Sequence, residues 1–319
     1  MAERNIIYAL QEQDSLAAEH GGSLVIPEGF LLPGFVAAAT CLGYKQRVNN
    51  IEYQDPGSHQ GLLEAFQVPY VLLGVDGYAQ ARVNVGSRYS PMQMLETPQD
   101  VDRATTDTTS CIRKHVGNLP GISGLCSVIG ELHDNVRAHA EGAGFSMALI
   151  WRRMGQEDVI EFALADAGKG FWAECQRRGI EGIDCHETAI DWCLRPRNST
   201  KDNDFGEFAQ RLEEDAIGNP FGEEAAPWHN GNHHQGLGLD QLMKLVSAYN
   251  GDLWVASGDA ALVSTPWTRN DQAFGNYVPV RHWQGVAIAC RLKISELGRN
   301  VEEEPLTEAV ENLLGDLLF

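Results

Sequence analysis

The sequence has few positive charges and no long apolar run. Lysine and arginine number 24 among 319 residues, against 44 aspartates and glutamates, so the formal net charge is −20. Nonspecific binding to nucleic acid needs a positive surface, which this balance argues against. No apolar run approaches the length that spans a bilayer. The sequence therefore predicts no nucleic-acid partner and no membrane partner, whereas a basic protein partner is compatible with it.

The sequence also lacks a signal peptide and a disulfide framework. Its amino terminus has neither the basic start nor the continuous apolar segment of a secretory signal. Its seven cysteines are scattered without a close pair, so they are expected to be reduced thiols in a cytoplasmic protein. Zinc binding is left open, because thiolates and imidazoles are the usual zinc ligands. The candidates are Cys175, Cys185, His186, Cys193, His229, His233 and His234.

The most informative segment carries a polar row on a predicted helix. Glu131, Asn135 and His139 recur at every fourth residue, so helical geometry places their side chains on one face. An apolar row lies one residue out of phase and consists of Ile122, Leu125, Ile129, Leu132, Val136 and Ala140. The polar row therefore lies along the rim of the buried face, where it could meet a ligand. An ordinary amphipathic helix is the alternative interpretation.

A predicted strand over residues 159–166 runs directly into a glycine turn. Its large apolar residues alternate and share one face; they are Ile160, Phe162 and Leu164. Asp166 falls in the same phase at the strand's end, and Gly168 and Gly170 let the backbone turn sharply after it. A carboxylate in this position could accept a hydrogen bond from an amino group.

A third element places glycines at the start of a helix. Gly236, Leu237 and Gly238 precede a helical stripe that consists of Leu239, Leu242, Val246 and Tyr249. Asn250 and Gly251 supply the stop signal. Unpaired amide groups at a helix start suit a phosphate group.

In this order the three elements resemble the nucleotide-binding boxes of the GHKL ATPase superfamily, which includes gyrase, Hsp90, histidine kinases and MutL. The resemblance covers roughly residues 105–294. It implies an α/β (α+β) fold, a Bergerat-type ATP-binding sandwich with helices on one face of a mixed sheet. The cofactors that it implies are ATP and Mg²⁺.

The resemblance implies a role for each residue of the first two boxes. Asn135 would ligate a magnesium ion that bridges the phosphates, since magnesium prefers hard oxygen ligands. Glu131 would polarise the attacking water or an acceptor hydroxyl. Asp166 would bind the adenine amino group, and Gly168 and Gly170 would let the backbone approach the nucleotide.

The third box and the segment before it would hold the phosphates. Backbone amides around Gly236, Leu237 and Gly238 would bind them, and Lys201, in a Thr-Lys pair typical of the lid, would contact the terminal phosphate. The lid itself is assigned to residues 171–235. Its acidic part, residues 202–233, is interpreted either as a solvated lid or as a docking surface for a protein partner.

The rest of the chain divides by pattern. Residues 1–90 are predicted to form a small α/β domain, weakly similar to a STAS-like module; the alternative is an extension packed on the ATPase domain. Residues 91–106 are expected to be a linker and residues 107–295 the ATP-binding domain. Residues 296–319 contain a helical apolar stripe, through which a partner or a second copy could bind.

The leading functional hypothesis is an ATP-binding regulatory protein with weak magnesium-dependent ATPase activity, whose lid responds to nucleotide and controls a protein partner. His115 lacks the context of a histidine-kinase phosphoacceptor. Too few residues follow the second glycine box for the transducer domain of gyrase-like members, so unassisted hydrolysis is expected to be slow. The alternatives are a serine/threonine protein kinase of the anti-sigma-factor type and a non-hydrolysing interaction scaffold.

Overall fold

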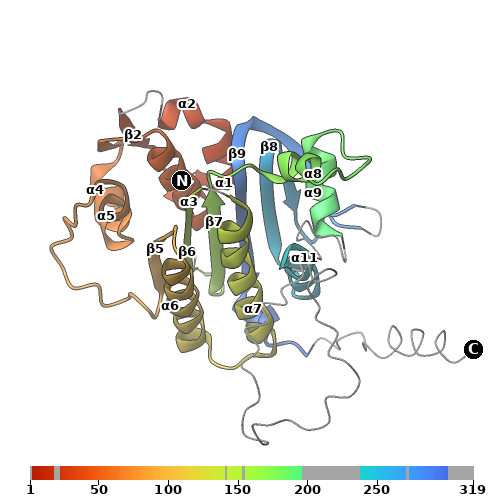
Figure 1. Cartoon of the computed structure of the whole chain (residues 1–319). Helices are drawn as coiled ribbons and strands as arrows, with labels where there is room; N and C mark the ends of the chain where they lie inside the picture. Colours follow the sequence, from red (N-terminus) through yellow and green to blue (C-terminus); the bar gives the residue numbers. More distant parts are fainter. Residues whose placement is uncertain are drawn as a thin grey trace, which may run out of the picture.

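The computed structural model describes residues 2–17, 22–140, 142–152, 155–195, 238–270 and 273–300, with no side-chain description for residues 139 and 140. Within these residues the protein is a mixed α/β structure, and its centre is a five-stranded antiparallel sheet (Figure 1). The strands lie in the order β5 (Tyr89–Leu95), β6 (Gly144–Trp151), β7 (Val159–Asp166), β9 (Asn276–Lys293) and β8 (Asp252–Ser264).

The predicted alternation in β7 is confirmed and divides the interior into two cores. Ile160, Phe162 and Leu164 belong to the core beneath the helices of one face, whereas Ala163 and Ala165 belong to the core of the other face. This follows from the two-residue period of a strand, which points successive side chains to opposite sides. Because both faces are covered, β7 is buried along nearly its whole length.

Three helices form the first layer: α6 (Pro98–Val116), α7 (Pro120–Asn135) and α11 (Gly238–Ala248). Figure 1 shows α6 and α7 in front of the sheet, with α11 beside them. Each helix buries an apolar stripe. In α7 and the turn after it this stripe is Ile122, Leu125, Ile129, Leu132 and Val136, as predicted; in α11 and the turn after it the stripe is Leu239, Leu242, Val246 and Tyr249.

Two helices from the amino-terminal part, α1 (Ile6–Gln11) and α3 (Pro33–Lys45), cover the other face. Small residues allow α3 to approach the sheet closely: a Cβ on Gly34 would lie 3.0 Å from the Cβ atoms of both Ala289 and Ile6. Proline near the start of α3 suits a helix amino terminus, where its missing N–H is not needed. This layer therefore packs tightly against an alanine-rich surface.

The remaining amino-terminal elements lie around α3. They comprise the parallel pairs β1 (Glu3–Arg4) with β3 (Phe30–Leu31) and β2 (Ser23–Ile26) with β4 (Asn50–Tyr53), and the helices α2 (Gln13–Leu16), α4 (Pro56–Ala65) and α5 (Val68–Leu73). Residues 1–90 thus contain both strands and helices, as expected of an α/β segment. Residues of this segment share the core of the sheet's second face.

A buried ion pair joins the sheet to α3. Glu161 of β7 accepts a hydrogen bond from the Arg291 Nε of β9 at 2.9 Å and another from the Gly34 backbone N–H at 3.3 Å. The Arg291 guanidinium also lies 5.0 Å from the ring centroid of Trp151 and 5.2 Å from that of Trp254. Burial raises the pKa of Glu161, and Arg291 opposes that rise.

Three sequence-based expectations need correction. The sheet is not mixed, because all four of its ladders are antiparallel; short connections such as that between β6 and β7 favour this arrangement. Helices cover both faces rather than one. Residues 91–106 are not a linker: they form most of β5 and the first half of α6, whose start carries a capping box between Thr97 and Asp100.

The described residues of the carboxyl half also form the short helices α8 (Phe171–Arg177), α9 (His186–Leu194) and α12 (Ile294–Leu297). The tail after residue 300 lies outside the described residues. Among the helices that the structure describes, none is long and apolar enough to cross a membrane.

Candidate functional site

Glu131 and Asn135 lie on the last turns of α7, on the rim of its buried face. Glu131 is 7 % exposed and Asn135 is half-buried, as expected of a polar row beside an apolar stripe. After Asn135 the helix changes to a π-helix, η1 (Val136–Ala140). The predicted row therefore does not continue as a regular α-helix to His139. Such π segments often occur at functional sites, because they alter the direction of side chains within a helix.

His133 fixes the rotation of α7 between its neighbours. Its Nδ1 lies 2.9 Å from the Thr105 hydroxyl of α6, and its Nε2 lies 2.8 Å from the Ser146 hydroxyl of β6. The ring is fully buried, and desolvation lowers its pKa to about 3. A neutral imidazole thus joins three elements and holds Glu131 and Asn135 toward the same side.

Gly238, the first residue of α11, lies directly against this polar pair. A Cβ at position 238 would lie 3.1 Å from Glu131 Oε2 and 3.4 Å from Asn135 Nδ2. A side chain at this position would have to displace Glu131 by a few tenths of an ångström, so glycine suits the close approach of α11. Gly238, the described residue of the third box, is therefore a neighbour of the first box, and the first described turn of α11 lies beside a carboxylate and a carboxamide.

Asp166 occupies the end of β7, where it is 5 % exposed. Its Oδ1 accepts a hydrogen bond from the Gly168 N–H at 2.8 Å, and the Val286 N–H also donates to the carboxylate. Burial raises the pKa of Asp166 to about 6, although both hydrogen bonds oppose the rise. The carboxylate is thus held as an acceptor in a site that excludes water.

The loop after Asp166 is fastened to β8 and β9. The Ser257 hydroxyl accepts from the Phe171 N–H at 3.0 Å and donates to the Gly285 carbonyl at 3.0 Å. Gly285 has a φ of +107°, and a Cβ there would lie 2.2 Å from the Asp166 carbonyl oxygen. Gly170 also has a positive φ, of +77°. The glycines therefore serve the close approach of three backbone segments.

The first two boxes are connected through the edge of β6. Gly144 pairs with Asp166 in the ladder between β6 and β7. Val136, next to Asn135, packs over Gly144 so closely that a Cβ on Gly144 would lie 2.6 Å from Val136 Cγ1. The end of α7 and the end of β7 are therefore neighbours, and Glu131, Asn135, Asp166, Gly168, Gly170 and Gly238 surround one end of the sheet.

Several predicted residues lie outside the described residues, namely Lys201, Gly236, Leu237, His229, His233 and His234, together with the acidic segment 202–233. For the zinc alternative, the described part of the chain contains no group of three or more His, Cys, Asp or Glu side chains placed to hold a metal ion.

Sequence reasoning missed the residues that support this site from a distance. His133 lies within the first box but was hidden between Leu132 and Asp134, without a pattern of its own. Ser257 and Gly285 lie on strands far along the chain, so no local spacing connects them to Asp166. One signal was available: an isolated glycine within a strand pattern often marks a close backbone approach, which applies to Gly285.

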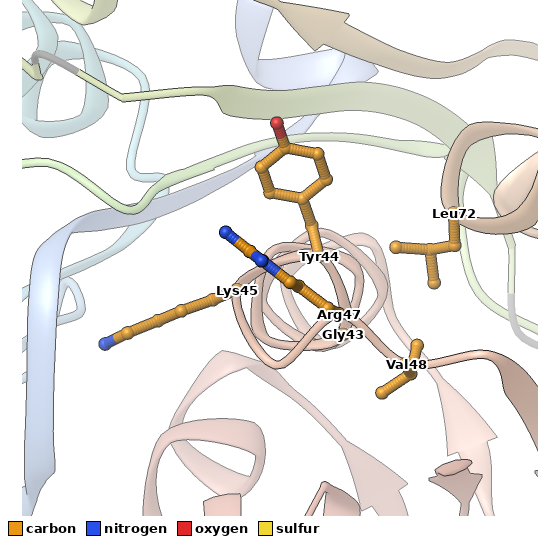
Figure 2. A pocket seen from close by; sticks show the side chains of 6 residues that line it. All are labelled: Gly43, Tyr44, Lys45, Arg47, Val48 and Leu72. Atoms are coloured by element: carbon orange, nitrogen blue, oxygen red, sulfur yellow. The ribbon is translucent and has the colours of Figure 1, made fainter. Parts of the chain in front are cut away.

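A separate hollow of about 450 Å³ lies at the carboxyl end of α3. Figure 2 shows that Tyr44, Lys45 and Arg47 extend from the end of this helix, whereas Leu72 comes from α5. Gly43 and Val48 complete the lining. None of the described residues of the three boxes lines this hollow. Tyr44 packs on Phe145, beside the Gly144 that pairs with Asp166, so the hollow lies at the same end of the sheet but on the face that α3 covers.

No protein-family model matches the chain, and no curated protein or solved structure gives a significant match. The function must therefore be inferred from the side chains and backbone groups described above.

Proposed function

We propose that the protein binds ATP together with magnesium at the end of the sheet where α7, β7 and α11 meet, and that it hydrolyses the nucleotide slowly. The supporting observation is the position of Gly238 beside Glu131 and Asn135. A Cβ added to Gly238 would lie 3.1 Å from Glu131 Oε2 and 3.4 Å from Asn135 Nδ2. The start of α11, the Glu131 carboxylate and the Asn135 carboxamide thus lie next to one another, although they are far apart in the sequence.

The donor set fits a magnesium-bound polyphosphate. Asn135 offers the hard carbonyl oxygen that magnesium prefers, and the amino end of α11 offers backbone N–H groups to phosphate oxygens. Asp240 in the first turn of α11 is buried, and Lys244 binds it at 2.9 Å, so its negative charge is compensated within the helix. Bound magnesium would neutralise part of the phosphate charge.

The remaining side chains would orient the attacking water and recognise the adenine base. Glu131 would accept a proton from the attacking water and orient it, from a helix whose rotation His133 fixes. Asp166 would accept a hydrogen bond from the adenine amino group, since a carboxylate keeps further lone pairs after binding Gly168 and Val286. The loop from Gly168 to Gly170, held by Ser257, would form the floor beneath the base.

The protein-kinase alternative has the same site and a different acceptor. In one molecule, the amino-terminal helices α1 and α3 cover the opposite face of the sheet from α7 and α11. Thr40 of α3 is the one serine or threonine of these two helices, and it is fully buried with its hydroxyl donating to the Val36 carbonyl, so it is not accessible as an acceptor. Transfer to a partner, or to a second copy, is the form of this alternative that suits the arrangement.

The test follows terminally labelled ATP with magnesium on the purified wild type and on Glu131→Gln. Free phosphate, labelled protein and retained ATP are recorded together. We expect slow phosphate release that falls by about 100-fold or more in Glu131→Gln, because a positioned general base contributes on that scale. Asp102→Asn, which makes the same kind of change at an exposed position of α6, should release phosphate at the wild-type rate.

Each other outcome points to a different function. Label on protein would favour the kinase, and retention of intact ATP by both forms would indicate a binding switch that needs a partner. Equal turnover in the wild type and Glu131→Gln would overturn the role of Glu131. If neither protein retains or turns over ATP, the nucleotide site itself is refuted and the scaffold alternative gains support.

A further inference from the structure

The hollow at the carboxyl end of α3 has a charged side and an apolar side. Figure 2 shows the side chains of Lys45 and Arg47 on one side of the helix end, with Leu72 and Val48 on the other. The apolar side is closely packed, because a Cβ on Gly43 would lie 3.2 Å from Leu72 Cδ1 and 3.3 Å from Val48 Cγ2. The volume of about 450 Å³ is typical of small-molecule sites. The lining therefore suits a ligand with a charged group and an apolar body.

The two cations of the hollow have no carboxylate partner among the described residues. Lys45 and Arg47 form no ion pair there, although the chain has 44 acidic residues and only 24 lysines and arginines. Elsewhere in the described structure many cations face a carboxylate, as Arg103 of α6 pairs with Asp100. Two positive charges that the described carboxylates leave unpaired, beside a hollow, favour an anionic ligand.

Arg47 has a backbone conformation that favours glycine. Its φ is +51°, and it follows the last turn of α3, where the Val48 N–H donates to the Gly43 carbonyl and the Arg47 N–H donates to the Tyr44 carbonyl, both at 3.0 Å. Glycine is the usual residue in this turn, because a side chain is strained at a positive φ. The chain thus has a cation where glycine would fit the backbone better. The same hydrogen bonds occupy carbonyls that would otherwise repel an anion.

We propose that this hollow binds a small organic phosphate monoester. Lys45 and Arg47 hold the phosphate, whose nearly double negative charge matches their two positive charges, whereas a carboxylate would match only one. The apolar side contacts the organic body. The Tyr44 ring completes the lining and is held in place by Phe145, with 5.1 Å between the ring centroids. This site lies on the α3 face and is separate from the proposed nucleotide site, which α7 and α11 flank.

Equilibrium dialysis of the full-length chain against phenyl phosphate tests the proposal. The buffer contains EDTA, so that no magnesium supports the proposed nucleotide site. We expect phenyl phosphate to bind more tightly than inorganic phosphate, which lacks the apolar body, and more tightly than benzoate, which carries a single charge. Added sodium chloride should weaken the binding, because salt screens exposed charges. Lys45→Gln and Arg47→Gly should each weaken it by about 5-fold or more, since each removes a charge-assisted contact.

Arg47→Gly separates binding from folding. Glycine adopts the positive φ of position 47 without strain, so the free energy of unfolding in urea should stay close to the wild-type value. Lys114→Gln is the matched control for Lys45→Gln, because Lys114 is an exposed lysine in the last turn of α6. This control should bind phenyl phosphate as the wild type does.

Three results would overturn the proposal. The first is that phenyl phosphate does not bind, and the second is that Lys45→Gln and Arg47→Gly bind it as tightly as the wild type. The third is equal binding of inorganic phosphate and phenyl phosphate, which would exclude an organic ester as the preferred ligand. The readout uses neither ATP nor magnesium, so its failure is independent of the proposed ATPase function.

Discussion

The two faces of the central sheet are packed with different kinds of residue. On the face of α6, α7 and α11 the core consists largely of leucine, isoleucine and valine, whereas on the face of α3 alanines dominate the contact. Large side chains keep a helix farther from a sheet. This spacing leaves room for polar side chains at the ends of those helices. Small side chains bring a helix close and leave little room. The comparison explains why the candidate site belongs to the first face.

The charges on the two faces differ as well. Glu161, on the α3 face, already has Arg291 and the Gly34 N–H as partners. Asp166, at the end of the other face, accepts only backbone hydrogen bonds in the described structure and retains acceptor capacity. Two buried carboxylates on one strand therefore differ: the first joins the amino-terminal layer to the sheet, and the second is the one that the proposed ligand would use.

The largest expected effect comes from removing the carboxylate of the α3 face. Glu161→Ala leaves the Arg291 guanidinium buried without its carboxylate, which should lower the free energy of unfolding by about 3–5 kcal/mol. Urea unfolding measures this change. ATP retention per folded molecule, measured well below the unfolding midpoint, should stay at the wild-type level because Glu161 faces away from the site.

An exposed ion pair between the same two parts of the chain provides the control. Asp14 of α2 binds Arg281 of β9 at 2.5 Å, and both side chains are more than half exposed. Asp14→Ala should therefore lower the free energy of unfolding by less than about 1 kcal/mol. Similar losses for the two variants would contradict the distinction between buried and exposed pairs. Loss of ATP retention in folded Glu161→Ala would contradict the separation of the two faces.

The next effect is smaller and depends on pH. His133 has a folded pKa of about 3, below its ordinary value of 6.5, because burial disfavours the charged ring. The unfolded chain therefore takes up the proton first, and stability that is complete above about pH 6.5 is lost as the pH falls toward 3. Between about pH 7 and about pH 5 this amounts to about 2 kcal/mol.

Urea unfolding of the wild type and His133→Gln at both pH values measures the difference in slope. Glutamine cannot titrate, and it keeps hydrogen-bonding groups for Thr105 and Ser146, so the variant should lose about 2 kcal/mol less on acidification. His282→Gln, at an exposed position of β9, should keep the wild-type slope. Equal slopes in the wild type and His133→Gln would show that His133 is not buried in its neutral form.

Local pattern predicted much of the fold. The apolar periods of residues 122–136 and 239–249, the alternation of residues 159–166 and the glycines at their ends correspond to α7, α11 and β7. These signals depend only on neighbours in the chain, which is why they are readable. Thr97, Pro98 and Asp100 also form a local signal, since a capping box marks a helix start. Its neglect produced the mistaken linker over residues 91–106.

Contacts between distant segments were not predictable in the same way. Nothing near Asp166 in the sequence indicates Gly285 or Ser257, and nothing near Glu161 indicates Arg291 or Gly34. Strand pairing and the packing of the amino-terminal layer decide these contacts, and a single sequence does not display them. The same limit applies to η1, where α7 loses its regular period just as Val136 packs over Gly144. The residue types of the site were thus predictable, but the supports around it were not.

The smallest effect concerns Asp166 and has the opposite sign to that of His133. Its folded pKa is about 6, above the ordinary value of 3.8, because the ionised form is buried. The folded chain therefore keeps its proton longer than the unfolded chain, and stability falls as the pH rises between these values. From about pH 5 to about pH 7 the wild type should lose about 1 kcal/mol relative to Asp166→Asn.

Asp166→Asn separates the stability effect of this carboxylate from its proposed role. The variant should lack the pH-dependent loss and should also lose ATP retention, because an amide NH₂ or a misplaced carbonyl replaces one acceptor for the adenine amino group. Urea unfolding at the two pH values and retention of labelled ATP measure the two properties, with Asp102→Asn as the exposed control. A changed pH dependence of stability with normal ATP retention would support the burial of Asp166 but contradict its role in binding adenine. If Asp166→Asn loses both the pH-dependent change in stability and ATP retention, the Asp166 carboxylate destabilises the fold when it is ionised and also binds the nucleotide.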